Sequence, residues 1–108
     1  MKTLKDKVIV ITGASSGIGE AMAREYAARG AKVVLGARSV QKLQLLAGEI
    51  GRHGGQAAYC GVDVTQPEEC RGLIDTAVRE FGGVDVLVCN AGISMRALFD
   101  DVELEVLH

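Results

Sequence analysis

The chain has 108 residues, close to the commonest length of one domain, so we expect a single domain over residues 1–108. Hydrophobic residues make up 48% of the sequence and the formal net charge is −2, which argues against disorder and against a nucleic-acid-binding surface. The apolar runs are too short for a membrane span, and we predict a cytoplasmic protein.

Four short apolar runs divide the sequence and predict strands. They are Val8–Ile11, Val33–Leu35, Ala57–Cys60 and Val86–Cys89. Each run is continuous rather than alternating, which is typical of strands that are buried on both faces of a parallel sheet. The run Ala57–Cys60 is the least hydrophobic, so we expect it at an edge of the sheet.

The three segments between these runs carry apolar residues at helical spacing, and we expect each stripe to face the core. The stripes are Ile18, Ala21, Met22 and Tyr26; Leu43, Leu46, Ala47 and Ile50; and Cys70, Leu73, Ile74, Ala77, Val78 and Phe81. Thr65 followed by Glu68 predicts a capping box at the start of the third helix, and Gly82 predicts its end.

The order of these elements predicts an α/β fold of the Rossmann type, a doubly wound parallel sheet with strand order 3-2-1-4. Strand order reverses between the first and fourth strands, so a ligand is expected beyond their carboxyl ends.

The end of the chain predicts an interrupted fold. Asp100 and Asp101 resemble a helix N-terminus, and Val102–His108 would then form a short helix that ends without a stop signal. We therefore expect an incomplete sheet that lacks its C-terminal strands. Its fourth strand would be an exposed edge, which favours a homo-oligomer or association through strand edges.

A glycine-rich loop follows the first strand in the sequence VIVITGASSGIGEA. Gly13 permits a tight turn, Gly17 permits close approach of a ligand, and Gly19 permits close packing of the helix on the strand. The helix N-terminus and the hydroxyls of Ser15 and Ser16 favour a phosphate. A simple turn would also explain three glycines, but a strand before and a helix after favour a nucleotide site.

The residue that reads the ribose is expected at the end of the second strand. A site for NAD usually carries Asp or Glu there, whereas this sequence has Ala37 followed by Arg38. A guanidinium suits the 2′-phosphate that distinguishes NADP from NAD. The alternative is an ordinary exposed surface arginine.

Together, Thr12–Gly19 and Asn90-Ala91-Gly92 resemble the classical short-chain dehydrogenase/reductase family, and Val62-Asp63-Val64 also fits. The resemblance covers essentially the whole chain and implies a dinucleotide cofactor, NADP in preference to NAD. Cys89 departs from the family, which often has a second Asn there. The implied cofactor-binding residues are Gly13, Ser15, Ser16, Gly17, Ile18, Gly19, Arg38, Ser39, Asp63, Val64, Asn90, Ala91 and Gly92. Without the resemblance, Asp63 and Asn90 could equally be turn and loop residues.

The resemblance also implies a catalytic Tyr with a Lys four residues later, plus a Ser and an Asn. Tyr26 is followed at that spacing by Gly30, and Tyr59 by Asp63, so no catalytic residue is assigned. The leading hypothesis is the cofactor-binding half of an NADP(H)-dependent oxidoreductase acting on an alcohol or ketone. The alternatives are a non-catalytic dinucleotide-binding module and a structural fragment paired with another chain.

Three further residue types are expected to have no chemical role. The cysteines are odd in number and have no CxxC pair, so we expect free thiols and no metal site. His53 is expected in an exposed loop, and Asp85 on a solvated face.

Overall fold

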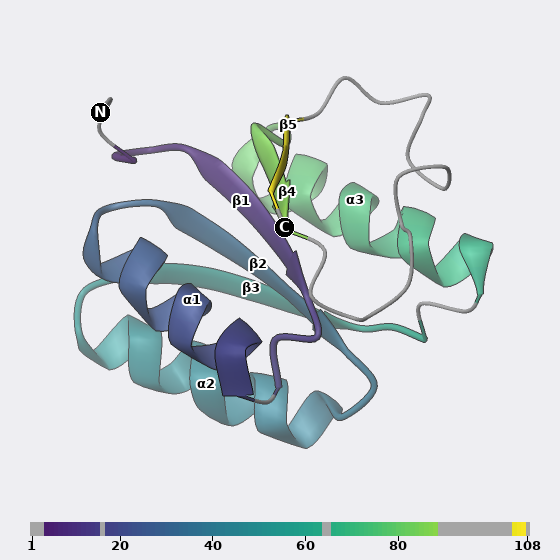
Figure 1. Cartoon of the computed structure of the whole chain (residues 1–108), viewed down its shortest axis with the longest axis horizontal. Helices are drawn as coiled ribbons and strands as arrows, with labels where there is room; N and C mark the ends of the chain where they lie inside the picture. Colours follow the sequence, from purple (N-terminus) through teal and green to yellow (C-terminus); the bar gives the residue numbers. More distant parts are fainter. Residues whose placement is uncertain (1–3, 16, 64–65, 89–104, 108) are drawn as a thin grey trace.

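The computed structural model describes residues 4–15, 17–63, 66–88 and 105–107. Figure 1 shows the arrangement of the elements. They are β1 (Val8–Thr12), α1 (Gly17–Ala28), β2 (Lys32–Ala37), α2 (Val40–Arg52), β3 (Gln56–Gly61), α3 (Pro67–Phe81), β4 (Val86–Val88) and β5 (Glu105–Leu107).

The five strands form one parallel sheet in the order β3-β2-β1-β4-β5 (Figure 1). This confirms the predicted order 3-2-1-4 and the Rossmann-type fold. β1 lies between β2 and β4, so Ile9 is paired with Val33 on one side and with Val86 on the other.

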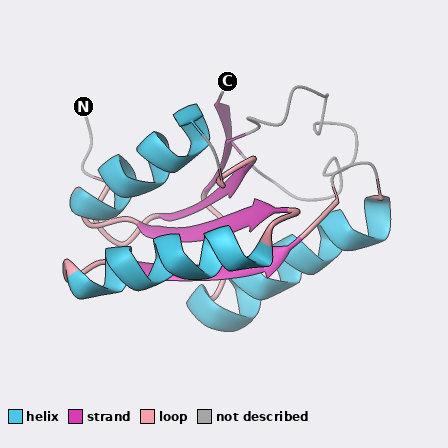
Figure 2. Ribbon diagram, turned by 90° about the horizontal axis from the view of Figure 1, so that it is seen from below, coloured by secondary structure: helices cyan, strands magenta, loops and turns pink. Residues whose placement is uncertain are grey.

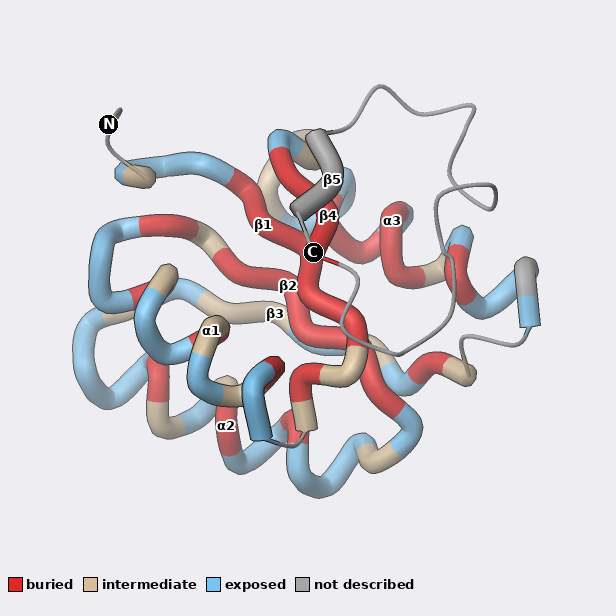
Figure 3. The backbone as a smooth tube through the Cα atoms, in the orientation of Figure 1, coloured by how far each residue is buried: buried red, intermediate tan, exposed pale blue. Residues whose placement is uncertain are grey.

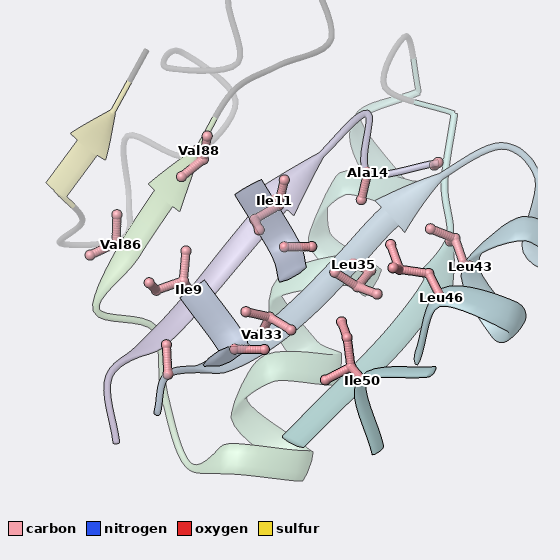
Figure 4. Close-up of a cluster of buried hydrophobic side chains, with 14 residues drawn as sticks. Ile9, Ile11, Ala14, Val33, Leu35, Leu43, Leu46, Ile50, Val86 and Val88 are labelled. Carbon is pink, nitrogen blue, oxygen red and sulfur yellow. The ribbon is translucent and has the colours of Figure 1, made fainter. Parts of the chain in front are cut away.

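Helices lie on both sides of the sheet (Figure 2). Alternate residues of each strand point to opposite faces, so Ile9 and Ile11 pack with α1 and α2, whereas Val8 and Val10 pack with α3. Figure 4 shows the first of these two clusters, in which Leu43 and other buried residues of α2 meet the strands. The continuous apolar runs are therefore explained by burial on both faces.

Burial decreases from the centre of the sheet toward β3 (Figure 3). Every residue of β1 is buried, whereas β3 has exposed and half-buried residues along its whole length. The prediction that the Ala57–Cys60 run forms an edge strand is confirmed. Cys60 is half-buried and Cys70 is buried.

The stripe predicted for α1 is only partly correct. Ile18 and Ala21 are exposed, and the residues buried against the sheet are Gly19, Ala23 and Ala27. Small residues at this spacing allow the helix to approach the strands closely, so the face with the least side-chain volume is the buried one. In α2 the predicted stripe is confirmed, because Leu43, Leu46 and Ile50 are all buried.

The predicted start of α3 is wrong, and its predicted end is confirmed. The N-cap is Gln66, without a side-chain capping bond, and Pro67 opens the helix at a position where its fixed φ suits the first turn. Thr65 lies outside the described residues. Gly82 ends the helix in a left-handed conformation, with φ of 85°. One stripe residue, Val78, is 52% exposed.

The predicted C-terminal helix is also wrong, since Glu105–Leu107 is a strand. It pairs in parallel with β4, so the edge that we expected to be exposed is covered. A seven-residue helix is marginal in water, whereas an added strand satisfies backbone groups of β4 that would otherwise lack partners. Because β5 covers it, the β4 edge no longer gives a reason to expect association between chains.

Candidate functional site

The carboxyl ends of the central strands are joined by hydrogen bonds at one end of the sheet, which we call the carboxyl edge. The buried Thr12 hydroxyl donates to the Val88 carbonyl oxygen at 3.4 Å, which joins the ends of β1 and β4. The Ala14 amide donates to the Gly36 carbonyl oxygen at 3.2 Å, which joins the glycine-rich loop to β2. The loop therefore starts from a fixed position at the point where strand order reverses.

The loop has the backbone geometry that its glycines permit. Gly13 and Gly17 have left-handed φ values of 66° and 47°, respectively. A Cβ added to Gly17 would meet no atom within 4 Å, so the space beside it is open to a ligand. Ser15 is half-buried, while Ile18 at the start of α1 is 70% exposed.

Arg38 lies just beyond β2 and forms an ion pair across the edge. Its Nη2 atom is 3.3 Å from Oδ1 of Asp63, in the segment after β3. The Arg38 side chain is 76% exposed and the Asp63 side chain 29% exposed. Two residues that are 25 positions apart are thus brought together where the ribose and adenine of a dinucleotide are expected.

The backbone around Asp63 is also held in place. The Asp63 amide donates to Oε1 of Glu69 at 3.0 Å, and the Asp63 carbonyl oxygen accepts from the Gln66 amide at 2.9 Å. The Val62 amide donates to the Ala37 carbonyl oxygen at 2.8 Å. The turn is therefore anchored to both α3 and β2.

A groove of about 330 Å³ extends from the glycine-rich loop between α1 and α2. Its lining includes Ser15, at the loop, and Lys42, in the first turn of α2. Ser39 is the N-cap of α2, and its hydroxyl accepts a hydrogen bond from the Lys42 amide at 3.4 Å. The Lys42 ammonium adds a positive charge near the place where a phosphate is expected.

A second groove, of about 370 Å³, lies at the other end of these helices. It is lined by residues that include Ala28 at the end of α1 and His53 after α2. These residues precede the amino ends of β2 and β3, so this groove is far along the strands from the carboxyl edge. His53 is exposed, as predicted, and its ring Nδ1 lies 2.8 Å from the Glu49 carbonyl oxygen.

Arg24 connects α1 to α2 beside the first groove. Its guanidinium contacts Glu20 at 2.9 Å in its own helix and also contacts Glu49 of α2. The hydrogen bond from Arg24, followed by its positive charge, lowers the pKa of Glu49. The bonds to Glu20 and Glu49 raise the pKa of Arg24. The positive charge of Arg24 is therefore already paired with the carboxylates of Glu20 and Glu49.

Five predicted site residues lie outside the described part of the chain. They are Ser16, Val64, Asn90, Ala91 and Gly92. The structure brings the remaining ones to the carboxyl edge of the sheet or to the first turns that follow it. Among the described residues, His, Cys, Asp and Glu side chains do not gather in groups of three or more that could hold a metal ion.

Sequence reasoning missed Glu69 and Lys42 as parts of this edge. Glu69 stands three residues after the N-cap, the position of the acidic member of a capping box, and this is the signal that could have identified it. Its carboxylate accepts from the Asp63 amide rather than from the N-cap amide.

Comparison with known proteins identifies the family to which this arrangement belongs. A family model described as short chain dehydrogenase matches residues 7–107. The chain belongs to the short-chain dehydrogenase family. Its resemblance to that family, first seen in the glycine-rich loop, is thereby confirmed.

Relatives within the short-chain dehydrogenase family include several oxidoreductases. An uncharacterised oxidoreductase of Listeria innocua is 48% identical over 91 residues, which cover 84% of this chain and 37% of the relative. The 11-beta-hydroxysteroid dehydrogenase 1A of Arabidopsis thaliana is 44% identical over 104 residues, covering 94% of this chain and 30% of that protein. The chain thus spans about a third of the length of such short-chain dehydrogenases.

Solved structures of dehydrogenases and reductases are similar in fold. One of them is the L-sorbose reductase of Gluconobacter frateurii, complexed with NADPH and L-sorbose. It has a TM-score of 0.80 and 41% identity, with 86% of this chain and 36% of that chain covered. A short-chain dehydrogenase/reductase from Mycobacterium marinum has a TM-score of 0.78 and 49% identity, with coverages of 83% and 36%. No described helix of our chain has the length and apolar character needed to cross a membrane.

Proposed function

We propose that this chain is the NADPH-binding part of an oxidoreductase that interconverts an alcohol and a ketone. The observation that carries the proposal is the exposed guanidinium of Arg38, which follows the buried Ala37 at the end of β2 where an acid would favour NADH. The L-sorbose reductase neighbour, whose structure contains NADPH, supports the same choice of cofactor.

The residues present fit a dinucleotide along the carboxyl edge. The open space beside Gly17 would accept the pyrophosphate, and the exposed amides of the α1 N-terminus would donate to its oxygens. Arg38, with Ser39 beside it, would contact the 2′-phosphate, and Asp63 would lie beside the adenine. The exposed side chain of Ile18 would cover part of the bound cofactor. When bound, NADPH supplies the hydride for reduction of a carbonyl group.

The predicted residues outside the described part complete the proposal. Ser16 would contribute a hydroxyl to the phosphates and Val64 would lie beside the adenine. Asn90, Ala91 and Gly92 would support the nicotinamide side. A cytoplasmic location and a homo-oligomeric state remain predictions.

Titration calorimetry with NADPH and NADH tests the proposed function. We expect NADPH to bind at least about tenfold more tightly, because a hydrogen bond to a charged group contributes about 1.5–3 kcal/mol. Equal affinities would contradict the assignment of NADPH, and no heat with either dinucleotide would contradict binding as such.

A non-catalytic binding module is the second candidate function, and the positions of the tyrosines favour it for this chain alone. Tyr26, in α1, packs against the hydrophobic core, and Tyr59 lies on the edge strand β3. Neither has a lysine four residues later. Both candidate functions therefore predict that this chain alone binds NADPH without oxidising it in the presence of ketones.

A further inference from the structure

We infer that Glu69 is a positioning residue for the cofactor, acting through the turn at Asp63; the inference rests on the proposed function. Glu69 belongs to α3 on one face of the sheet, whereas Arg38 follows β2. Asp63 lies between them and contacts both: its amide donates to Glu69 at 3.0 Å, and its carboxylate lies 3.3 Å from the Arg38 guanidinium.

The backbone amide of Asp63 is an unusual target for a glutamate in the first turn of a helix. A glutamate at this position ordinarily accepts from the N-cap amide of its own helix. Here the carboxylate of Glu69 reaches six residues back, past the N-cap Gln66, to the strand-to-helix connection. The bond therefore holds the Asp63 backbone and does not cap the helix.

Holding the Asp63 backbone restricts where the Asp63 carboxylate lies. The carbonyl oxygen of Asp63 is held by the Gln66 amide, so the bond from Glu69 restrains the other side of the same residue. With both backbone groups restrained, Asp63 can hold the long and exposed Arg38 side chain near one position. Loss of Glu69 would release the turn, which would move the group beside the adenine and loosen the group that contacts the 2′-phosphate.

The role also explains why a carboxylate suits this position. A charged acceptor forms a stronger hydrogen bond than a neutral one, and its charge is favourable at the helix N-terminus. Glu68 stands in the same turn and carries the same charge. It is therefore a matched control for the loss of charge without the loss of the bond.

The test compares Glu69→Ala, Glu69→Gln and Glu68→Ala in the full chain, with NADPH and 2′,5′-ADP as probes in titration calorimetry. We expect Glu69→Ala to weaken the binding of both probes by about tenfold, because Asp63, no longer held by a hydrogen bond to a charged group, must be ordered when a probe binds. Glu69→Gln retains an acceptor oxygen and should stay within about threefold of wild type, and Glu68→Ala within about twofold. Amide hydrogen exchange at Asp63 should accelerate in Glu69→Ala alone.

Several outcomes would overturn the inference. One is an equal loss of probe affinity in Glu69→Ala and Glu68→Ala, which would mean that the loss of a negative charge alone explains the effect. Another is a Glu69→Gln variant as weak as Glu69→Ala. If Glu69→Ala does not fold, Glu69→Asp replaces it, since the shorter side chain keeps the charge and should still lose affinity. Wild-type binding with no effect of Glu69→Ala rejects this inference alone, whereas a wild type that binds neither probe rejects the proposed function as well.

Discussion

Val8 and Asp85 exchange two hydrogen bonds at the amino end of the sheet. The Val8 amide donates to Oδ2 of the Asp85 side chain at 2.7 Å, and the Asp85 amide donates to the Val8 carbonyl oxygen at 2.9 Å. Asp85 is exposed, as the sequence predicted, but its carboxylate is engaged rather than only solvated. It therefore fixes the entry of β4 beside the first residue of β1.

Asp85→Ala should lower the free energy of unfolding by about 1.5 kcal/mol, because the Val8 amide loses a charged acceptor. Urea unfolding followed by circular dichroism measures the change. Asp85→Asn retains an acceptor oxygen and should recover at least half of the loss. Equal destabilisation by both substitutions would contradict a specific role for the hydrogen bond.

Arg38→Ala should weaken NADPH roughly tenfold to hundredfold and leave NADH nearly unchanged, because only NADPH carries the 2′-phosphate. Competitive titration with the two dinucleotides gives the ratio. Arg79→Ala is the matched control, since it removes a similarly exposed arginine from α3. Adding Ala37→Asp to Arg38→Ala should lower the affinity for NADPH further, because the new carboxylate repels the 2′-phosphate.

Salt gives an independent check on Arg38. The Arg38 side chain is largely exposed, so raising the ionic strength should reduce the difference in affinity between NADPH and NADH. If Arg38→Ala instead weakens both dinucleotides equally, the arginine supports the Asp63 turn and does not recognise the phosphate.

Gly36→Ala should be destabilising by about 1–3 kcal/mol, because the new methyl group overpacks the core. A Cβ on Gly36 would lie 2.7 Å from Cδ2 of Leu73 and 3.0 Å from Cγ1 of Val62. Gly48→Ala, in the exposed interior of α2, should instead be stabilising by about 0.5–1 kcal/mol, because alanine favours helix. Thermal unfolding compares the pair, and a shift in the same direction for both would contradict the packing argument.

The stabilisation that Glu49 provides should depend on pH. Arg24 lowers the pKa of Glu49 in the folded chain, so this contribution is present above the pKa of the unfolded state. It is lost as the pH falls through the lower, folded-state value. Glu49→Gln should therefore decrease the urea midpoint at about pH 7, and the difference from wild type should shrink toward about pH 3.

Glu25→Gln is the control for that experiment. Glu25 contacts Arg29 within α1, whereas Glu49 joins α2 to α1. We expect Glu49→Gln to have the larger effect, because it breaks a contact between helices. Both effects should be small in salt, since all of these side chains are well exposed.

The chain alone should transfer no hydride to ketones or aldehydes. General acid–base catalysis needs a positioned proton donor, and the sequence contains no Tyr followed four residues later by Lys. Absorbance of NADPH in the presence of a carbonyl panel measures turnover. Oxidation that persists after contaminating reductases are removed would contradict this prediction.

The central part of the fold could be predicted from the sequence because its signals are local. Continuous apolar runs identify β1, β2 and β4, and the stripe of α2 identifies its buried face. The stripe predicted for α1 was only partly correct, because the helix buries the small residues Gly19 and Ala23 against the sheet. A pattern based on hydrophobicity does not identify such small residues. β5 was missed because its pairing with β4 is a contact between distant segments.

The candidate site shows the same division. Its glycine-rich loop is a contiguous motif, so position and conformation follow from the sequence. Arg38 was predicted as a phosphate reader, but its contact with Asp63 joins residues 25 positions apart and leaves no local pattern. The bond from Glu69 to Asp63 departs from the usual capping geometry, and therefore only the folded structure reveals it.

The burial gradient across the sheet determines the order in which its backbone opens. β1 is completely buried and has a hydrogen-bonded strand on each side, whereas β3, among the described strands, is paired with β2 alone. Amide protons of β1 should therefore exchange with deuterium only when the whole domain unfolds, while those of β3 exchange through local opening. Cys60, on β3, becomes accessible to a thiol reagent in the same local event, well before the buried Cys70 of α3.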